Sequence, residues 1–245
     1  MSELLSPGFF CWVDVAVTDP TVSHKFFSEL FGWSRRVRPT EDAQAYNIMT
    51  LGSRRVAGIC GVEQDGPSQW MSYLLVDDLE SSTNRAQTLG AKVWKPRVDI
   101  ANLGEMSVLQ DPTGAVFALW QSKKDEQATP RTPGTLGWTE LITPDLDGAT
   151  QFYSELAGWS YKDTRFGDLD YRVFSLDGKE VCGMKSGPSP SEWVVHFAVD
   201  DCDAVYRKVS ELGGEGIQEP FDLQGIGRCA LVADPSGGEF GIVEY

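Results

Sequence analysis

The strongest constraint on the fold is an internal duplication. Residues 26–34 read FFSELFGWS and residues 152–160 read FYSELAGWS, an offset of 126 positions. Further along, residues 67–78 (PSQWMSYLLVDD) match residues 190–201 (PSEWVVHFAVDD) at an offset of 123. Self-similarity at a nearly fixed spacing indicates that one structural unit is built twice. We therefore expect two copies of about 115 residues that differ by a few residues in one loop.

A polar segment separates the two copies. Residues 122–134 read SKKDEQATPRTPG, show no apolar periodicity and contain Pro130 and Pro133. Prolines and small polar residues without periodicity are typical of linkers. The sequence therefore predicts a first domain over residues 1–121, a linker over 122–134 and a second domain over 135–245.

Each copy contains a weaker internal repeat. In the first module Val13, Val15 and Val17 occupy alternate positions, which is typical of a strand with one buried face. Asp19 has the character of a helix N-cap, and Gly32 that of the residue that ends a helix. Short β-like runs follow the helix, and the same order recurs three more times. We therefore expect four β-α-β-β-β modules, two in each domain.

The charge balance narrows the choice of partners. The 245 residues include 36 acidic and 21 basic side chains, so the formal net charge is −15. Nucleic acids and anionic membranes both require clustered Lys and Arg, so we expect neither as a partner.

No apolar run reaches about 18 residues, MSELLSPGFF lacks the regions of a secretory signal, and the five cysteines form no CxxC pair. We predict a cytoplasmic monomer or homodimer whose partner is a small-molecule ligand.

Three motifs connect this pattern to a known family. They are the FYSELAGW-type first helix, the V-D-D step before the second helix, and the Asp-Pro-Thr/Ser-Gly turns at 111–114 and 234–237. With them, the chain resembles the vicinal oxygen chelate superfamily of glyoxalase I, extradiol dioxygenases and the fosfomycin and bleomycin resistance proteins. It is most similar to the tandem glyoxalase-like proteins common in actinobacteria. The resemblance implies an α+β fold, in which four βαβββ modules form two half-barrel glyoxalase-like domains with helices on the outer face.

The resemblance also implies where a metal ion would bind. Members of the family hold a divalent ion on the concave face of each domain, through His, Glu or Gln side chains of the first and last strands of the modules. The matching positions here carry Trp12, Met71, Trp138 and Val194 on the first strands, and about Ala118 and Gly241 on the closing strands. Indole, thioether and alkyl groups are poor ligands for such ions. We therefore expect neither a metal site nor another cofactor.

The alternation along the strands predicts which side chains face the concave side. If Val13, Val15 and Val17 face the helices, their neighbours face the other way, and a slip of one residue would reverse every assignment. The expected concave residues are Trp12, Asp14, Met71, Tyr73, Trp138, Glu140, Val194 and His196. Trp120 is expected nearby. The indoles either stack on a planar or aromatic ligand or fill the space left by a lost metal.

Two of the predicted concave residues could take part in catalysis. Glu140 and His196 would face one another across the second cavity and could act as general base and general acid. The alternative is a buried structural pair held by a hydrogen bond. Asp14 and Tyr73 form the corresponding pair of the first cavity. His24, between Ser23 and Lys25 on the first helix, is expected to be solvated.

These observations leave several functions open. The first is binding of a small planar or aromatic metabolite in metal-free, Trp-lined clefts, for resistance, sequestration or an accessory role in secondary metabolism. The alternative is a metal-independent lyase, isomerase or cyclase that uses Glu140 and His196. A second alternative is a metal-dependent glyoxalase or dioxygenase, and a third is an interaction module. The sequence does not decide whether the protein is an enzyme.

Overall fold

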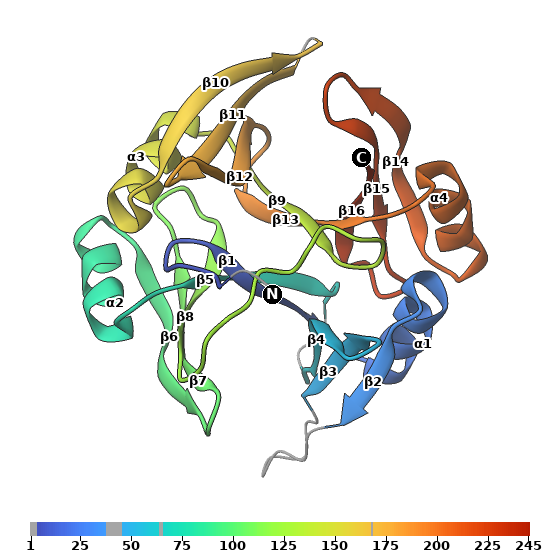
Figure 1. Ribbon diagram of the computed structural model, residues 1–245, viewed down its shortest axis with the longest axis horizontal. Helices are drawn as coiled ribbons and strands as arrows, with labels where there is room; N and C mark the ends of the chain where they lie inside the picture. The colour runs from blue at the N-terminus through green and yellow to red at the C-terminus, as the bar shows by residue number, and fades with distance from the viewer. Residues whose placement is uncertain (1–3, 38–45, 64–65, 168) are drawn as a thin grey trace. The chain divides into compact units, whose positions relative to one another are not determined.

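The chain folds into four modules with the same order of elements. The computed structural model describes residues 4–37, 46–63, 66–167 and 169–245 (Figure 1). The first module consists of β1 (Phe10–Val17), α1 (Pro20–Phe31), β2 (Ser34–Val37), β3 (Asn47–Leu51) and β4 (Arg54–Gly61). The second consists of β5 (Gln69–Leu75), α2 (Leu79–Thr88), β6 (Lys92–Ile100), β7 (Gly104–Gln110) and β8 (Val116–Ser122).

The third and fourth modules repeat this order. The third consists of β9 (Leu136–Thr143), α3 (Leu146–Ala157), β10 (Ser160–Phe166), β11 (Leu169–Leu176) and β12 (Lys179–Ser186). The fourth consists of β13 (Glu192–Ala198), α4 (Cys202–Glu211), β14 (Glu215–Leu223), β15 (Gly227–Ala233) and β16 (Glu239–Glu244). The helices are too short and too polar for any of them, in the described part of the chain, to cross a bilayer.

The strands form two eight-stranded sheets. Their orders are β2-β3-β4-β1-β5-β8-β7-β6 and β10-β11-β12-β9-β13-β16-β15-β14. Within each module the first strand pairs in parallel with the last, as β1 does with β4 and β9 with β12, whereas the remaining pairs are antiparallel. The predicted fold class is confirmed: α+β, four βαβββ modules, and two glyoxalase-like half-barrel sheets.

The helix boundaries follow from capping residues. The carboxylate of Asp19 accepts hydrogen bonds from the backbone N–H groups of Thr21 and Val22, which are among the free donors at the start of α1. Gly32 ends α1 in the left-handed region at φ 72°, where a side chain would be strained. Both predicted boundaries are confirmed.

The described residues divide into two compact units. Unit 1 comprises the residues up to Trp12, Ser72–Ala128 and Thr139–Trp193, and unit 2 comprises Val13–Met71, Thr129–Trp138 and Val194–Tyr245. Each unit therefore contains one module from each sequence copy: the second and third in unit 1, the first and fourth in unit 2. The predicted domains 1–121 and 135–245 group the modules by sequence copy instead, and that division stays a prediction.

The two cores follow the same division. In unit 2, Val13, Val15 and Val17 pack with the aromatic residues of α1 and with Val195 and Phe197 of β13. This confirms the predicted strand phase, because the alternate valines face the helix-side core. In unit 1 the core combines residues of α2 and β8 with residues of α3 and β12.

A buried polar chain runs through the core of unit 1. The Tyr153 hydroxyl donates to Asp111 Oδ2 at 2.9 Å and accepts from Trp193 Nε1 at 2.8 Å. Asp111 Oδ1 accepts three backbone N–H groups of its own turn, those of residues 113–115. Burial raises the pKa of the Asp111 carboxyl, and its hydrogen bonds oppose that rise.

Unit 2 contains the same site without the hydroxyl. Phe27 replaces Tyr153, while Trp70 and Asp234 stand where unit 1 has Trp193 and Asp111. Asp234 Oδ1 accepts backbone N–H groups of its own turn, as Asp111 does. Trp70 Nε1 and Asp234 Oδ2 are both buried, and neither has a partner in hydrogen-bonding geometry among the described residues. Burial raises the pKa of Asp234 as well. The Ser68 side chain lies close enough to Asp234 to oppose the rise in its pKa.

The prediction for His24 is wrong. Its side chain is 8% exposed, because α1 contacts β2 as well as β4 and α4, so more of the helix surface is covered than its apolar stripe alone. Burial, reinforced by the positive charge of Arg35 on β2, lowers the pKa of His24 to about 4.

Candidate functional site

In unit 1 a buried acid lies on the sheet face opposite the core. Glu140 on β9 is paired in register with Gly183 on β12, and its side chain is 8% exposed. Lys185, two residues further along β12, places its Nζ 2.6 Å from Glu140 Oε2, and its side chain is 28% exposed. The buried side chain of Glu140 therefore has a cationic partner, Lys185, whose own side chain is partly exposed to solvent.

A tyrosine lies beside this ion pair. A Cβ atom at Gly183 would overlap the hydroxyl of Tyr171, so the glycine makes room for the phenol. Gly183 is the register partner of Glu140, which places the phenol beside Glu140 on the sheet. Tyr171 is itself buried. Glu140, Lys185 and Tyr171 together form the acid cluster of unit 1, which offers a carboxylate acceptor, an ammonium donor and a phenol.

Unit 2 has a related but simpler arrangement. Asp14 on β1 is paired in register with Gly58 on β4, and the hydroxyl of Tyr46 donates to Asp14 Oδ2 at 3.0 Å. A Cβ atom at Gly58 would overlap the Tyr46 hydroxyl, just as in unit 1. Cys60 stands where unit 1 has Lys185. The acid of unit 2 therefore accepts a hydrogen bond from a neutral donor, the hydroxyl of Tyr46.

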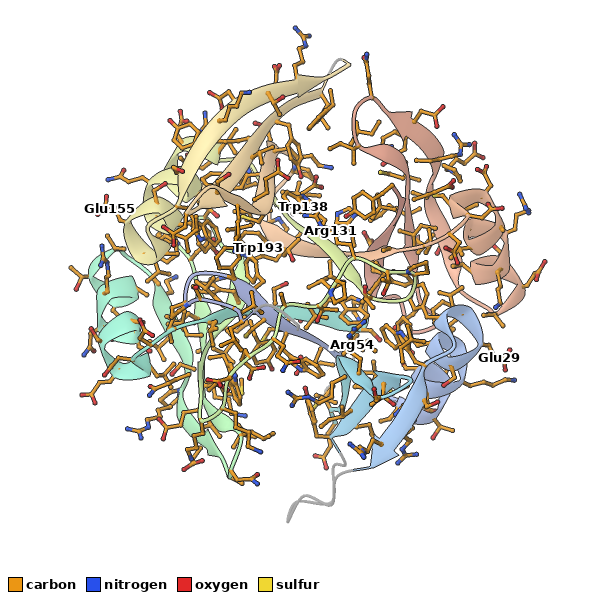
Figure 2. The ribbon with its side chains drawn as sticks, viewed as in Figure 1. Glu29, Arg54, Arg131, Trp138, Glu155 and Trp193 are labelled. Atoms are coloured by element: carbon orange, nitrogen blue, oxygen red, sulfur yellow. The ribbon has the colours of Figure 1, made fainter. Side chains whose placement is uncertain are left out.

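Unit 2 also holds an aromatic and cationic group. The guanidinium carbon of Arg131 lies 5.1 Å from the centre of the Trp138 ring and 5.4 Å from that of Tyr245, and Figure 2 labels Arg131 and Trp138 close to one another beside β9. His196 on β13 is paired in register with Gly241 on β16, and a Cβ atom at Gly241 would overlap its imidazole. Gly241 therefore allows the ring to lie across the neighbouring strand.

The predicted site residues are distributed over both units. Those of unit 1 are Trp12, Tyr73, Trp120 and Glu140, and those of unit 2 are Asp14, Met71, Trp138, Val194 and His196. The pairs Glu140–His196 and Asp14–Tyr73 each join residues of different units, and both pairings stay predictions. Within unit 1, Trp120 Nε1 donates to Glu126 at 3.2 Å, and the thiol of Cys11 lies 3.5 Å from the carbonyl oxygen of Tyr73.

Sequence reasoning missed the partners that lie on neighbouring strands. Lys185 and Tyr171 follow β10 in the chain and meet Glu140 only through the register of the sheet. One signal was available: Lys185 follows Gly183 by two residues and therefore shares its face of β12. Arg131 lies in the predicted linker 122–134, and nothing in its neighbourhood in the sequence points to an aromatic contact.

The described residues do not fit a divalent metal ion. No three His, Cys, Asp or Glu side chains come together in the parts of the chain that the structure describes. The positions that the family resemblance assigns to ligands carry Trp12, Met71, Trp138 and Val194, and none of these side chains is a suitable donor. The buried acid of unit 1 is instead engaged by the ammonium group of Lys185.

The comparisons with known proteins agree with this fold. The family model of the glyoxalase-like domain matches residues 12–120 and 138–243. CFP32 of Mycobacterium tuberculosis, whose name assigns it provisionally to the glyoxylases, is 35% identical over 243 residues, covering 95% of this chain and 93% of that protein. The anthracycline biosynthesis protein DnrV of Streptomyces peucetius is 33% identical over 259 residues, covering 98% of this chain and 94% of that protein.

Solved structures show the same architecture at lower identity. The Mn(II)-bound glyoxalase of Novosphingobium aromaticivorans aligns with a TM-score of 0.71 at 14% identity, covering all of this chain and 83% of that chain. The 2,3-dioxygenase LapB of Pseudomonas sp. KL28 aligns with a TM-score of 0.67 at 17% identity, covering all of this chain and 93% of that chain. With both repeats matched by the family model, the chain belongs to the glyoxalase-like family of the vicinal oxygen chelate superfamily.

Proposed function

We propose that the protein binds a small planar or aromatic metabolite on the sheet faces opposite its cores. The observation that carries this proposal is the pair Trp12 and Trp138, which occupy equivalent first-strand positions of the two copies. At these positions the family resemblance implies metal ligands. A large flat indole in place of a metal-binding side chain gives a surface on which an aromatic ring can stack.

The relative DnrV supports an aromatic ligand. Its name places it in the biosynthesis of anthracyclines, which are planar polycyclic compounds, and it matches nearly the whole length of this chain. A role in handling such a metabolite, by sequestration or as an accessory of secondary metabolism, is consistent with the guanidinium group of Arg131 beside the Trp138 ring in unit 2. Unit 1 offers polar groups of its own in the acid cluster.

Calorimetric titration tests the proposal. Alizarin and daunorubicin serve as planar aromatic probes, and the wild-type protein is expected to bind at least one of them. Because a stacked aromatic pair contributes about 0.5–1.5 kcal/mol, Trp138→Ala is expected to weaken binding about three- to tenfold. Trp94 is exposed on β6, so Trp94→Ala is the matched control and should bind as the wild type does. The proposal would be contradicted if the wild-type protein bound neither of the two probes.

A metal-independent enzyme is the second candidate. The observation in its favour is the acid cluster of unit 1, where a buried carboxylate contacts a partly exposed ammonium group at 2.6 Å. Such a pair can hold and pass a proton if a substrate reaches it. The test is incubation with whichever aromatic probe binds, followed by mass spectrometry of the products. Turnover that persists in both Glu140→Gln and His196→Phe would remove these residues from the chemistry.

A further inference from the structure

We infer that Arg131, Trp138 and Tyr245 of unit 2 form a recognition site for an aromatic carboxylate. This inference rests on the proposed function and names the class of ligand more closely. The ring of the ligand would stack beside the indole of Trp138, and its carboxylate would pair with the guanidinium group of Arg131. The site is called the arginine–aromatic site below.

The backbone around the site places the three side chains together. Arg131 precedes β9, Trp138 lies within β9, and Tyr245 follows β16. Gly137 has no side chain, and a Cβ atom there would lie 2.9 Å from the Tyr245 hydroxyl oxygen, so the glycine makes room for the tyrosine. The guanidinium group then lies 5.1 Å and 5.4 Å from the two ring centres, within the range of a cation–π contact.

The charge of Arg131 is available for a ligand. Some arginines of this acidic chain pair with carboxylates, as Arg97 does with Glu105, Arg172 with Asp163 and Arg228 with Asp203. Among the described residues no carboxylate lies within ion-pair distance of Arg131, and its contacts are the two aromatic rings.

The chemistry of the three groups fits one class of ligand. A guanidinium group offers planar N–H donors that match both oxygens of a carboxylate. The cation–π contacts hold this group near the indole before a ligand arrives, so little freedom is lost on binding. A planar aromatic ring that carries a carboxylate satisfies the stacking surface and the donors at the same time. A neutral ring of the same shape satisfies the stacking surface alone.

The test compares two ligands of the same shape. Anthraquinone-2-carboxylate and anthraquinone-2-carboxamide are titrated into the full-length protein by calorimetry, at low and at physiological salt. The wild type is expected to bind the carboxylate about tenfold more tightly than the carboxamide, as one charge-assisted hydrogen bond to an exposed group provides. The preference should decrease as salt rises, because the pair is accessible to solvent.

Three variants locate the preference. Arg131→Gln should bring the ratio of the two affinities to about one, and Arg131→Lys should restore part of it, because lysine keeps the charge but not the planar fork. Arg207 is an exposed arginine on α4 of the same unit, so Arg207→Gln should keep the wild-type ratio. Arg131 is exposed, and thermal unfolding of each variant checks that the fold is intact.

The outcomes separate this inference from the proposed function. Equal affinity of the wild type for the two ligands, or a preference that survives Arg131→Gln, would overturn the arginine–aromatic site and leave aromatic binding standing. Failure of both ligands and of the earlier probes to bind would overturn the proposed function and this inference together.

Discussion

The two units share a core design but differ in one hydroxyl group. In both, an indole donates to the backbone of a glycine: Trp159 to Gly8 in unit 1 and Trp33 to Gly134 in unit 2, each at 2.7 Å. The ring packing is also alike. Tyr153 and Trp193 lie 5.2 Å apart at 84°, and their counterparts Phe27 and Trp70 lie 5.6 Å apart at 78°.

The consequence of the missing hydroxyl is electrostatic rather than steric. In unit 1, Tyr153 connects a buried carboxylate to a buried indole, whereas in unit 2 no hydrogen bond among the described residues satisfies Asp234 Oδ2 or Trp70 Nε1. Unsatisfied buried polar groups cost free energy because they lose their hydrogen bonds to water. The comparison therefore indicates that packing maintains the shape of both cores, and that only unit 1 gains from a satisfied polar chain.

Removing the hydroxyl of unit 1 should have the largest effect. Tyr153→Phe deletes two buried hydrogen bonds, one of them to a carboxylate, and leaves Asp111 and Trp193 as their counterparts are in unit 2. We expect the free energy of unfolding to fall by about 2–4 kcal/mol. Urea denaturation measures the change. A loss below about 0.5 kcal/mol would mean that the hydrogen bonds of Tyr153 to Asp111 and Trp193 contribute little to the stability of the fold.

The two aspartates should respond unequally to neutralisation. Asp111→Asn can turn an N–H donor toward Tyr153, whose own proton then has no acceptor, whereas Asp234→Asn meets no such hydroxyl. We expect Asp111→Asn to cost about 1–2 kcal/mol more than Asp234→Asn. Thermal unfolding of the two variants side by side gives the difference, and equal losses would remove the distinction between the units.

Adding the hydroxyl to unit 2 should have a smaller effect with the opposite sign. Phe27→Tyr places an O–H group where Tyr153 has one, between Trp70 Nε1 and Asp234 Oδ2. We expect a gain of about 1 kcal/mol in the free energy of unfolding, because two unsatisfied groups acquire a partner without a change of ring packing. The urea midpoint is the measurement, and Phe26→Tyr, on the same helix, is the control that should not gain. A destabilised Phe27→Tyr would show that unit 2 has no space for the oxygen.

The smallest effect concerns pH. The pKa of His24 is lowered from its ordinary value of 6.5 to about 4, so between these values the unfolded chain binds a proton that the folded chain does not. This group therefore costs stability progressively as the pH falls from about 6.5 to about 4. His24→Thr, which introduces the residue found at the equivalent position 150 of unit 1, should remove that cost. Urea midpoints at pH 7 and pH 4.5 test it, and an identical pH dependence of the wild type and the variant would contradict it.

The sequence predicted the repeating parts of this molecule well. The duplication, the four modules, the phase of Val13, Val15 and Val17, and the boundaries of α1 follow from periodicity and capping, which act between residues near in the chain. The partners of the site residues do not follow from such local patterns. Lys185 reaches Glu140 through a parallel strand pair, and a hydrophobic pattern tells which face a residue occupies but not which neighbour it meets.

The same limit applies to two further features of the fold. The pairing of the first module with the fourth, and of the second with the third, is a contact between helix faces that are far apart in sequence. The polar neighbours of His24 on one helix turn predict an exposed side chain, whereas α1 also contacts β2, and Arg35 of that strand lies near enough to lower the pKa of His24. Periodicity measures the apolar stripe of a helix, and it does not count the additional surface that a neighbouring strand covers.

Because each core takes one module from each sequence copy, the two copies are not independent pieces of protein. A homodimer of half-length chains arranged in this way would build both cores from identical residues. In such a dimer every substitution is made twice, once in each subunit, so both halves must tolerate it. In this single chain the two positions are free to differ, with Phe27 in one core and Tyr153 in the other.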